Sequence, residues 1–385
     1  MKFIPKSNQR EMDIKPERKI LLNPGPATTS DAVKYAQIVP DICPRENDFS
    51  EIVEKIRTDL KKIINANKYY TTVLFGGSGT AAMEAVLSSV VSPNKKVLIL
   101  INGAYGERFK KIAETHLLDH ICLKSEWGQP LNFLEAENIL KSENDIGYIV
   151  MVHHETSTGI LNPIEKFSQI AQKYMKVSIL DAISSFAAIP INVQKTPIDY
   201  LISTSNKCIQ GMAGISFVFC LKDKLDLLKS TSPRTVYLNL YEQYSSLEQS
   251  GQFQFTPPVQ TIYALKQAIS EFFNEGADCR FQRYKENYKI LKDGLLKLGF
   301  RVFVTEADES NILITVLEPK DDSYNFKKMH DALFYAGFTI YPGKVSNLKT
   351  FRLAVMGDLK KADIECFLLH LKKIIQEMKI KLIYD

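Results

Sequence analysis

The sequence predicts an α/β protein: a large domain with a mainly parallel sheet flanked by helices, plus a smaller C-terminal α/β domain. From residue 71 onward, short apolar runs alternate with longer amphipathic stretches, as in consecutive strand and helix units. After about residue 260, two long helical patterns come before three further strand-like runs. We therefore expect a large domain over residues 1–260, with an N-terminal extension, and a small domain over residues 261–385.

The strands of the large domain are predicted from short apolar runs, several of them rich in β-branched residues, which are typical of buried parallel strands. The predicted strands are Thr72–Phe75, Val97–Ile101, Ile146–Val152, Val177–Leu180, Tyr200–Ser203 and Ile215–Cys220. Helices are expected between them, for example at Thr80–Val90 and Gly106–His116.

The small domain is predicted from helical patterns that precede and follow strands. Its expected elements are the helices Thr261–Asn274 and Phe281–Leu298, the strands Ile312–Leu317, Phe338–Tyr341 and Phe351–Val355, and a final helix Lys361–Met378. Apolar residues such as Ile364, Phe367 and Ile374 recur in the last element at helical spacing. This helix is therefore expected to pack one face on the domain.

Composition and charge exclude several classes of protein. The 385 residues are 45% hydrophobic and 24% charged, as in ordinary globular chains. The formal charge is 49 − 44 = +5 without a dense basic run, so no nucleic-acid partner is expected. The six cysteines lie at least twelve residues apart, which predicts neither a CxxC metal site nor a disulfide framework, and hence a reducing, cytoplasmic location. No apolar run reaches the ~18 residues of a membrane helix, and Met1–Lys19 lacks the apolar core of a signal peptide.

A glycine-rich turn, Gly76-Gly77-Ser78-Gly79, joins the first predicted strand to the first predicted helix. Glycines let a backbone approach an anion, and the free N–H groups and dipole of a helix N-terminus favour negative charge. The turn is a candidate phosphate site, although a βα turn with nothing bound explains it equally well on its own. The segment also matches the dinucleotide pattern GxGxxA, but the next strand ends at Asn102 and not at the acidic residue that would bind a ribose. A nicotinamide-dependent oxidoreductase is therefore a distant alternative.

Two charged residues follow apolar strands. Asp181 comes directly after Val177–Leu180, and Lys207 follows Tyr200–Ser203. Because the carboxyl ends of parallel strands line one crevice, we expect these residues to face each other. Pyridoxal phosphate requires a lysine for a Schiff base, a carboxylate at its pyridine nitrogen and an anion site for its phosphate. The sequence offers all three.

Several motifs together resemble those of the fold-type I, class V pyridoxal-phosphate aminotransferases, and within that class the 2-aminoethylphosphonate:pyruvate aminotransferase family. The resemblance extends from Leu21 to about Ile374. The matching stretches are Asn23–Ser30, Asn102–Arg108, Val152–Gly159, Asp199–Ser203, Ser205–Gly211 and Tyr341–Lys344.

The resemblance implies a role for individual residues. Lys207 would be the Schiff-base lysine and proton shuttle, Asp181 the partner of the pyridine nitrogen, and Tyr105 the ring that stacks on the cofactor. Further cofactor contacts are implied at Ser78, Gly79, Thr80, Thr158, Asn206 and Thr256. Thr256 would reach the site of a neighbouring subunit, which implies a homodimer with shared active sites.

The implied substrates are 2-aminoethylphosphonate and pyruvate, with Arg352 and Gly25 as substrate-binding positions and no metal. A guanidinium suits a carboxylate or phosphonate because it donates two parallel hydrogen bonds. The alternative with the same chemistry is alanine:glyoxylate or serine:pyruvate transamination. His153, His154 and Cys208 also lie among these motifs, and we interpret them as structural residues.

Overall fold

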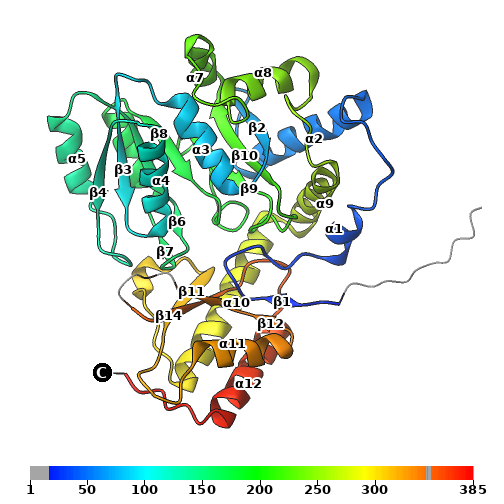
Figure 1. Cartoon of the computed structure of the whole chain (residues 1–385), viewed down its shortest axis with the longest axis vertical. Coiled ribbons are helices and arrows are strands. Elements are labelled where there is room, and N and C mark those ends of the chain that lie inside the picture. The colour runs from blue at the N-terminus through cyan, green and yellow to red at the C-terminus, as the bar shows by residue number, and fades with distance from the viewer. Residues whose placement is uncertain (1–16, 344, 346–347, 385) are drawn as a thin grey trace, which may run out of the picture.

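The computed structural model describes residues 17–343, 345 and 348–384. The N-terminal extension before residue 17 and Lys344 of the Tyr341–Lys344 motif lie outside them. The chain builds a large unit around one wide sheet and a smaller unit that lies below it in Figure 1. No helix of the described residues is long and apolar enough to cross a membrane.

The large unit contains a seven-stranded sheet in the order β2-β10-β9-β8-β5-β3-β4. Its strands are β2 (Tyr70–Gly76), β3 (Lys96–Ile101), β4 (His120–Lys124), β5 (Ile146–Val152), β8 (Val177–Asp181), β9 (Tyr200–Thr204) and β10 (Ile215–Leu221). Only β10 runs antiparallel to its neighbours β2 and β9, so the predicted, mainly parallel sheet is confirmed.

Helices flank this sheet (Figure 1). Among them, α3 packs on β9 and β10, α4 packs on β3 and β5, and α2 packs on β2 and α9. The helices are α1 (Asp31–Tyr35), α2 (Asn47–Ile63), α3 (Gly79–Val90), α4 (Ala104–Thr115), α5 (Phe133–Ser142), α6 (Ile164–Lys173), α7 (Lys222–Asp226), α8 (Leu240–Ser250) and α9 (Val259–Glu275). A two-stranded hairpin of β6 (His154–Glu155) and β7 (Ile160–Leu161) follows β5.

The smaller unit combines helices with two short sheets. Its elements are β1 (Ile20–Leu21), α10 (Ala277–Leu298), β11 (Leu313–Leu317), α11 (Phe326–Tyr335), β12 (Phe338–Thr339), β13 (Tyr341–Pro342), β14 (Thr350–Ala354) and α12 (Lys361–Glu377). β11, β14 and β13 form an antiparallel sheet, whereas β1 pairs in parallel with β12. A strand near the N-terminus is therefore part of a unit built otherwise from the C-terminal third. The domain boundary at residue 260 stays a prediction.

Two of the differences from the sequence prediction have identifiable reasons. The edge strand β4 was not predicted, because its five residues are all partly or fully exposed and include His120 and Lys124 among the apolar ones. The single strand expected at Phe338–Tyr341 is two short strands. The chain changes partners there, since β12 pairs with β1 and β13 pairs with β14.

Candidate active site

The glycine-rich turn connects β2 to the N-terminus of α3. Ser78 is the exposed N-cap residue and its hydroxyl makes no capping hydrogen bond, while Gly79 and Thr80 begin the helix. A Cβ atom on Gly79 would lie 2.7 Å from Cδ1 of Ile183, and one on Gly77 would lie 2.9 Å from the Ala81 Cβ. Only glycine at these two positions allows this close packing. The backbone N–H groups at the start of α3 could bind an anion here.

Asp181 is the last residue of β8 and is 3% exposed. Its Oδ1 accepts a hydrogen bond of 2.8 Å from the Ile183 N–H. Burial raises the pKa of Asp181 to about 7; the negative charge of Glu155 adds to the rise, whereas Arg108 and Lys207 oppose it. The ionised form of this buried carboxyl lacks the stabilisation that water gives. A cationic nitrogen beside it would supply that stabilisation instead.

Lys207 lies in the turn after β9 and its amine donates a hydrogen bond to the Pro24 carbonyl oxygen. Burial lowers the pKa of Lys207, which favours the neutral, nucleophilic amine. Gly25 leaves the space that this side chain occupies, because a Cβ there would lie 2.5 Å from the lysine Cδ and 2.6 Å from Nζ. The predicted substrate position Gly25 thus contacts the predicted Schiff-base lysine.

Tyr105 lies in the first turn of α4, which a buried carboxylate holds in place. Glu155 Oε2 accepts hydrogen bonds from the Tyr105 N–H at 3.0 Å and the Gly106 N–H at 3.2 Å. Its Oε1 accepts from the Ser157 hydroxyl at 2.6 Å and the Ser157 N–H at 3.2 Å. Glu155 is fully buried and its burial raises its pKa, but all four partners are donors and so match the ionised form. The carboxylate also lies at the positive end of the helix dipole.

Arg108, one turn further along α4, connects Tyr105 to the glycine-rich turn. Its guanidinium carbon lies 4.5 Å from the centre of the Tyr105 ring, and Nη1 donates a hydrogen bond of 3.0 Å to the Thr80 hydroxyl. The positive charge of Arg108 therefore lies beside the candidate phosphate site.

Arg352 lies on β14 and is 2% exposed. Its Nε donates to the Pro342 carbonyl oxygen and its Nη1 to that of Thr156, both at 3.1 Å. Burial lowers the pKa of Arg352, and a hydrogen bond with the side chain of Tyr105 opposes this. The guanidinium of the smaller unit is thereby held against the turn between β6 and β7 and against α4 of the large unit.

Three further residues were predicted to contact the cofactor, and the structure gives the environment of each. Thr158 is fully buried and donates its hydroxyl proton to the Glu155 carbonyl oxygen at 3.2 Å, within the turn between β6 and β7. Asn206 accepts from the Thr204 hydroxyl at 3.1 Å. Thr256 is exposed on the loop before α9, where the ring of Phe255 stacks on Tyr237, whose hydroxyl donates to Gly76.

His153, His154 and Cys208 are buried. His153 Nδ1 lies 2.9 Å from the Ser185 hydroxyl, and Cys208 Sγ donates to the Ser184 carbonyl oxygen at 3.3 Å. Burial raises the pKa of Cys208 to about 12, so its thiol is neutral and a poor nucleophile.

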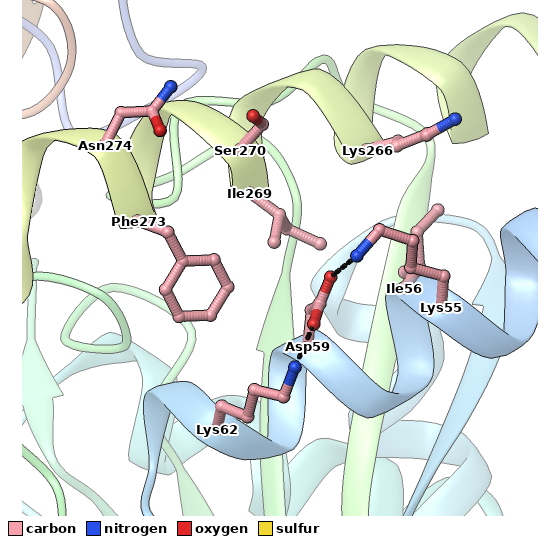
Figure 2. Close-up of a pocket in the computed structure, with 9 residues that line it drawn as sticks. All are labelled: Lys55, Ile56, Asp59, Lys62, Lys266, Ile269, Ser270, Phe273 and Asn274. Carbon is pink, nitrogen blue, oxygen red and sulfur yellow. Dashed lines mark hydrogen bonds and ion pairs between the residues drawn. The ribbon is translucent and has the colours of Figure 1, made fainter.

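A pocket of about 370 Å³ lies away from these residues, between α2 and α9 (Figure 2). Asp59 accepts hydrogen bonds there from Lys55 at 2.8 Å and Lys62 at 2.7 Å. Among the described residues, Asp59 is the one carboxylate that lines this pocket, and it is thus already paired. None of the predicted site residues lines the pocket.

The structure brings together Gly25, Gly79, Thr80, Tyr105, Asp181, Lys207 and Arg352. Glu155 and Arg108 had no role predicted from the sequence, although both lie in the motifs Val152–Gly159 and Asn102–Arg108. The only signal for Glu155 was a carboxylate shortly after an apolar strand; its partners on α4 are about 50 residues away.

The residues present fit pyridoxal phosphate: an amine of lowered pKa, a buried carboxyl and a glycine-rich helix start with a nearby guanidinium.

Comparison with known proteins gives a consistent result. The family described as "Aminotransferase class-V" matches residues 33–331. The 2-aminoethylphosphonate–pyruvate transaminases of Bacillus cereus strain Q1 and Bacillus anthracis strain A0248 are each 38% identical over 348 residues, which covers 90% of this chain and 94% of the relative.

Solved structures support the fold. A ureidoglycine–glyoxylate aminotransferase from Bacillus subtilis superposes with a TM-score of 0.87 at 22% identity and covers 96% of both chains. An alanine–glyoxylate aminotransferase from Nostoc sp. gives 0.87 at 23% identity, over 97% of this chain and all of that one.

Proposed function

This chain belongs to the class V aminotransferase family, and from that premise we propose that it transfers the amino group of 2-aminoethylphosphonate to pyruvate. The products are phosphonoacetaldehyde and L-alanine. The observation that carries the choice of substrates is the 38% identity, over 90% of the chain, to proteins named for this reaction. The cofactor is pyridoxal 5′-phosphate, as in the family.

The glycine-rich turn would hold the phosphate of the cofactor through Ser78, Gly79 and Thr80, with the positive charge of Arg108 beside it. Asp181 would hold the proton of the pyridine nitrogen, Tyr105 would cover one face of the ring, and Lys207 would bind the aldehyde carbon. When bound, the cofactor withdraws electrons from the amine-bearing carbon and carries the amino group between the two substrates.

The remaining chemistry belongs to the side chains. The Lys207 amine, whose pKa burial lowers, would take the proton from the amine-bearing carbon of the substrate and deliver it to the former aldehyde carbon of the cofactor. Arg352 binds the phosphonate of one substrate and the carboxylate of the other, since both are oxyanions that accept two parallel hydrogen bonds from a guanidinium. Its hydrogen bonds to the Thr156 and Pro342 carbonyl groups fix its orientation before a substrate arrives.

The active unit in this proposal is a cytoplasmic homodimer. Thr256 supports the proposed dimer because it is exposed on a loop that lies beside the glycine-rich turn and would be free to contact a second copy. The polar 2-aminoethylphosphonate and pyruvate are the expected small-molecule partners.

The absorbance spectrum of the purified protein tests the function. A visible cofactor band that 2-aminoethylphosphonate and L-alanine each bleach, without any keto acid present, is the expected result. Bleaching by L-alanine but not by 2-aminoethylphosphonate would favour alanine:glyoxylate transamination. If no band forms even with added pyridoxal phosphate, the cofactor assignment fails.

Two substitutions test the roles of the side chains. Lys207→Ala should abolish the visible band and turnover, whereas Lys124→Ala, at the exposed end of β4, should change neither. Arg352→Lys retains the charge but loses the planar fork, so the KM values for both substrates should rise by roughly tenfold or more. Unchanged KM values would remove Arg352 from the anion site.

A further inference from the structure

His154 is a buried imidazole with a defined tautomer. It is 2% exposed and lies on β6, directly before Glu155. The Ser184 hydroxyl donates its single proton to the His154 carbonyl oxygen at 2.9 Å. The same hydroxyl lies 3.0 Å from Nδ1 of the ring, so Nδ1 must be the donor in that contact. In the neutral ring, Nε2 is then a hydrogen-bond acceptor.

This acceptor has no partner among the described residues. Nε2 of His154 is a fully buried nitrogen without a hydrogen bond, and an unpaired buried polar atom costs free energy unless a ligand or water satisfies it. The neighbouring His153, whose Nδ1 also contacts a serine, has no nitrogen among the fully buried, unpaired side-chain atoms of the described residues. The difference between the two histidines therefore lies at Nε2.

The ring is connected to the turn of the proposed catalytic lysine through Ser184. Ser184, which holds Nδ1, also accepts a hydrogen bond from the thiol of Cys208, the residue after Lys207. Ser184 is three residues beyond Asp181 in sequence. Burial lowers the pKa of His154 to about 3, and the positive charges of His153 and Lys207 contribute. The ring is therefore neutral at physiological pH.

We propose that His154 is a further binding residue of the active site, whose Nε2 accepts a hydrogen bond from a donor on the bound ligand. This proposal rests on the proposed function. The expected ligands carry two donors of this kind. One is the ring hydroxyl of pyridoxal phosphate, and the other is the ammonium group of the amino substrate. The side chains of Lys207 and Arg352 are hydrogen-bond donors, so a neutral acceptor would favour ligands that carry a donor at this position.

Asparagine and glutamine substitutions at His154 distinguish the effect of Nδ1 from the effect of Nε2. The amide of His154→Asn reaches the position of Nδ1 and can still donate to Ser184, but has no atom at Nε2. His154→Gln places an amide oxygen near Nε2. The matched control is His153→Asn, because His153 has the same burial and a similar contact with a serine hydroxyl.

Two measurements distinguish the donors. The first is the affinity of the cofactor-free protein for pyridoxal phosphate, expressed as a Kd. The second is the KM for the amino donor, the aminoethylphosphonate, at saturating cofactor. His154→Asn should raise one of them by about five- to tenfold, the effect of one hydrogen bond. A rise in Kd identifies the ring hydroxyl, and a rise in KM alone identifies the substrate ammonium. His154→Gln should recover most of the loss, and His153→Asn should leave both values unchanged.

The proposal is overturned if His154→Asn changes neither value, or if all three variants lose affinity equally. Failure of the proposed function would show differently. In that case the unsubstituted protein would not bind pyridoxal phosphate or would not convert 2-aminoethylphosphonate, before any variant is compared.

Discussion

Asp181→Asn should make the cofactor-free protein more stable at alkaline pH, although it removes a residue to which the proposed function assigns a role. The carboxyl is 3% exposed and burial raises its pKa from 3.8 to about 7. One pKa unit corresponds to about 1.4 kcal/mol, so about three units make the ionised side chain cost roughly 4 kcal/mol. Asparagine has nearly the shape of the protonated acid and carries no charge.

The sign of the pH dependence follows from proton binding. Between pH 4 and pH 7, folded Asp181 retains a proton that the unfolded chain has released. The contribution of Asp181 to the stability of the unsubstituted protein therefore falls through this window as the pH rises, and it levels off above about pH 8. The Asn variant cannot titrate at this position. Its advantage should grow by about 1.4 kcal/mol per pH unit up to pH 7 and then stay constant.

Urea unfolding of the cofactor-free proteins at pH 5, 6, 7 and 8 measures this difference. His153 and His154, whose pKa values burial lowers to about 4 and about 3, affect both proteins equally and cancel. Asp293→Asn, at an exposed position on α10, is the control and should change stability by less than about 0.5 kcal/mol at each pH. A difference between Asp181→Asn and the parent that does not vary with pH would refute the reasoning.

Two further predictions concern the positions of backbone and side chains around the site. Glu155→Gln should reduce the free energy of unfolding by about 2–4 kcal/mol, because an amide group would face two of the four donors and the helix N-terminus would lose its charge. Glu137→Gln, at a partly exposed ion pair with a lysine, should cost less than about 1 kcal/mol in the same urea experiment, and equal losses would contradict the capping role. Gly25→Ala and Gly276→Ala both place a side chain at positive φ, at +113° and +84°, so both should destabilise the protein by about 1–2 kcal/mol. Only at Gly25 would the new Cβ meet Lys207, so the visible cofactor band should be lost there and kept in Gly276→Ala, which has open space around it.

Local sequence was sufficient for much of the architecture and for the reactive groups. The runs at Ile146–Val152 and Val177–Leu180 are mostly apolar and mostly buried, so their composition predicts them as strands. Asp181 and Lys207 were found because a parallel sheet collects the carboxyl ends of its strands at one edge. The glycine-rich turn was found because its close packing requires residues without a Cβ, and such residues are visible in the sequence.

Features that depend on distant contacts were not predictable in this way. Nothing in the local sequence of Glu155 indicates that its carboxylate caps α4, which begins about 50 residues earlier. Arg352 was expected to bind an anion, but only the structure shows that Thr156, on the other unit, accepts one of its hydrogen bonds. The unpaired nitrogen of His154 likewise depends on where Ser184 lies. Sequence periodicity records which face of an element is buried, whereas the partner across that face is decided by how the whole chain packs.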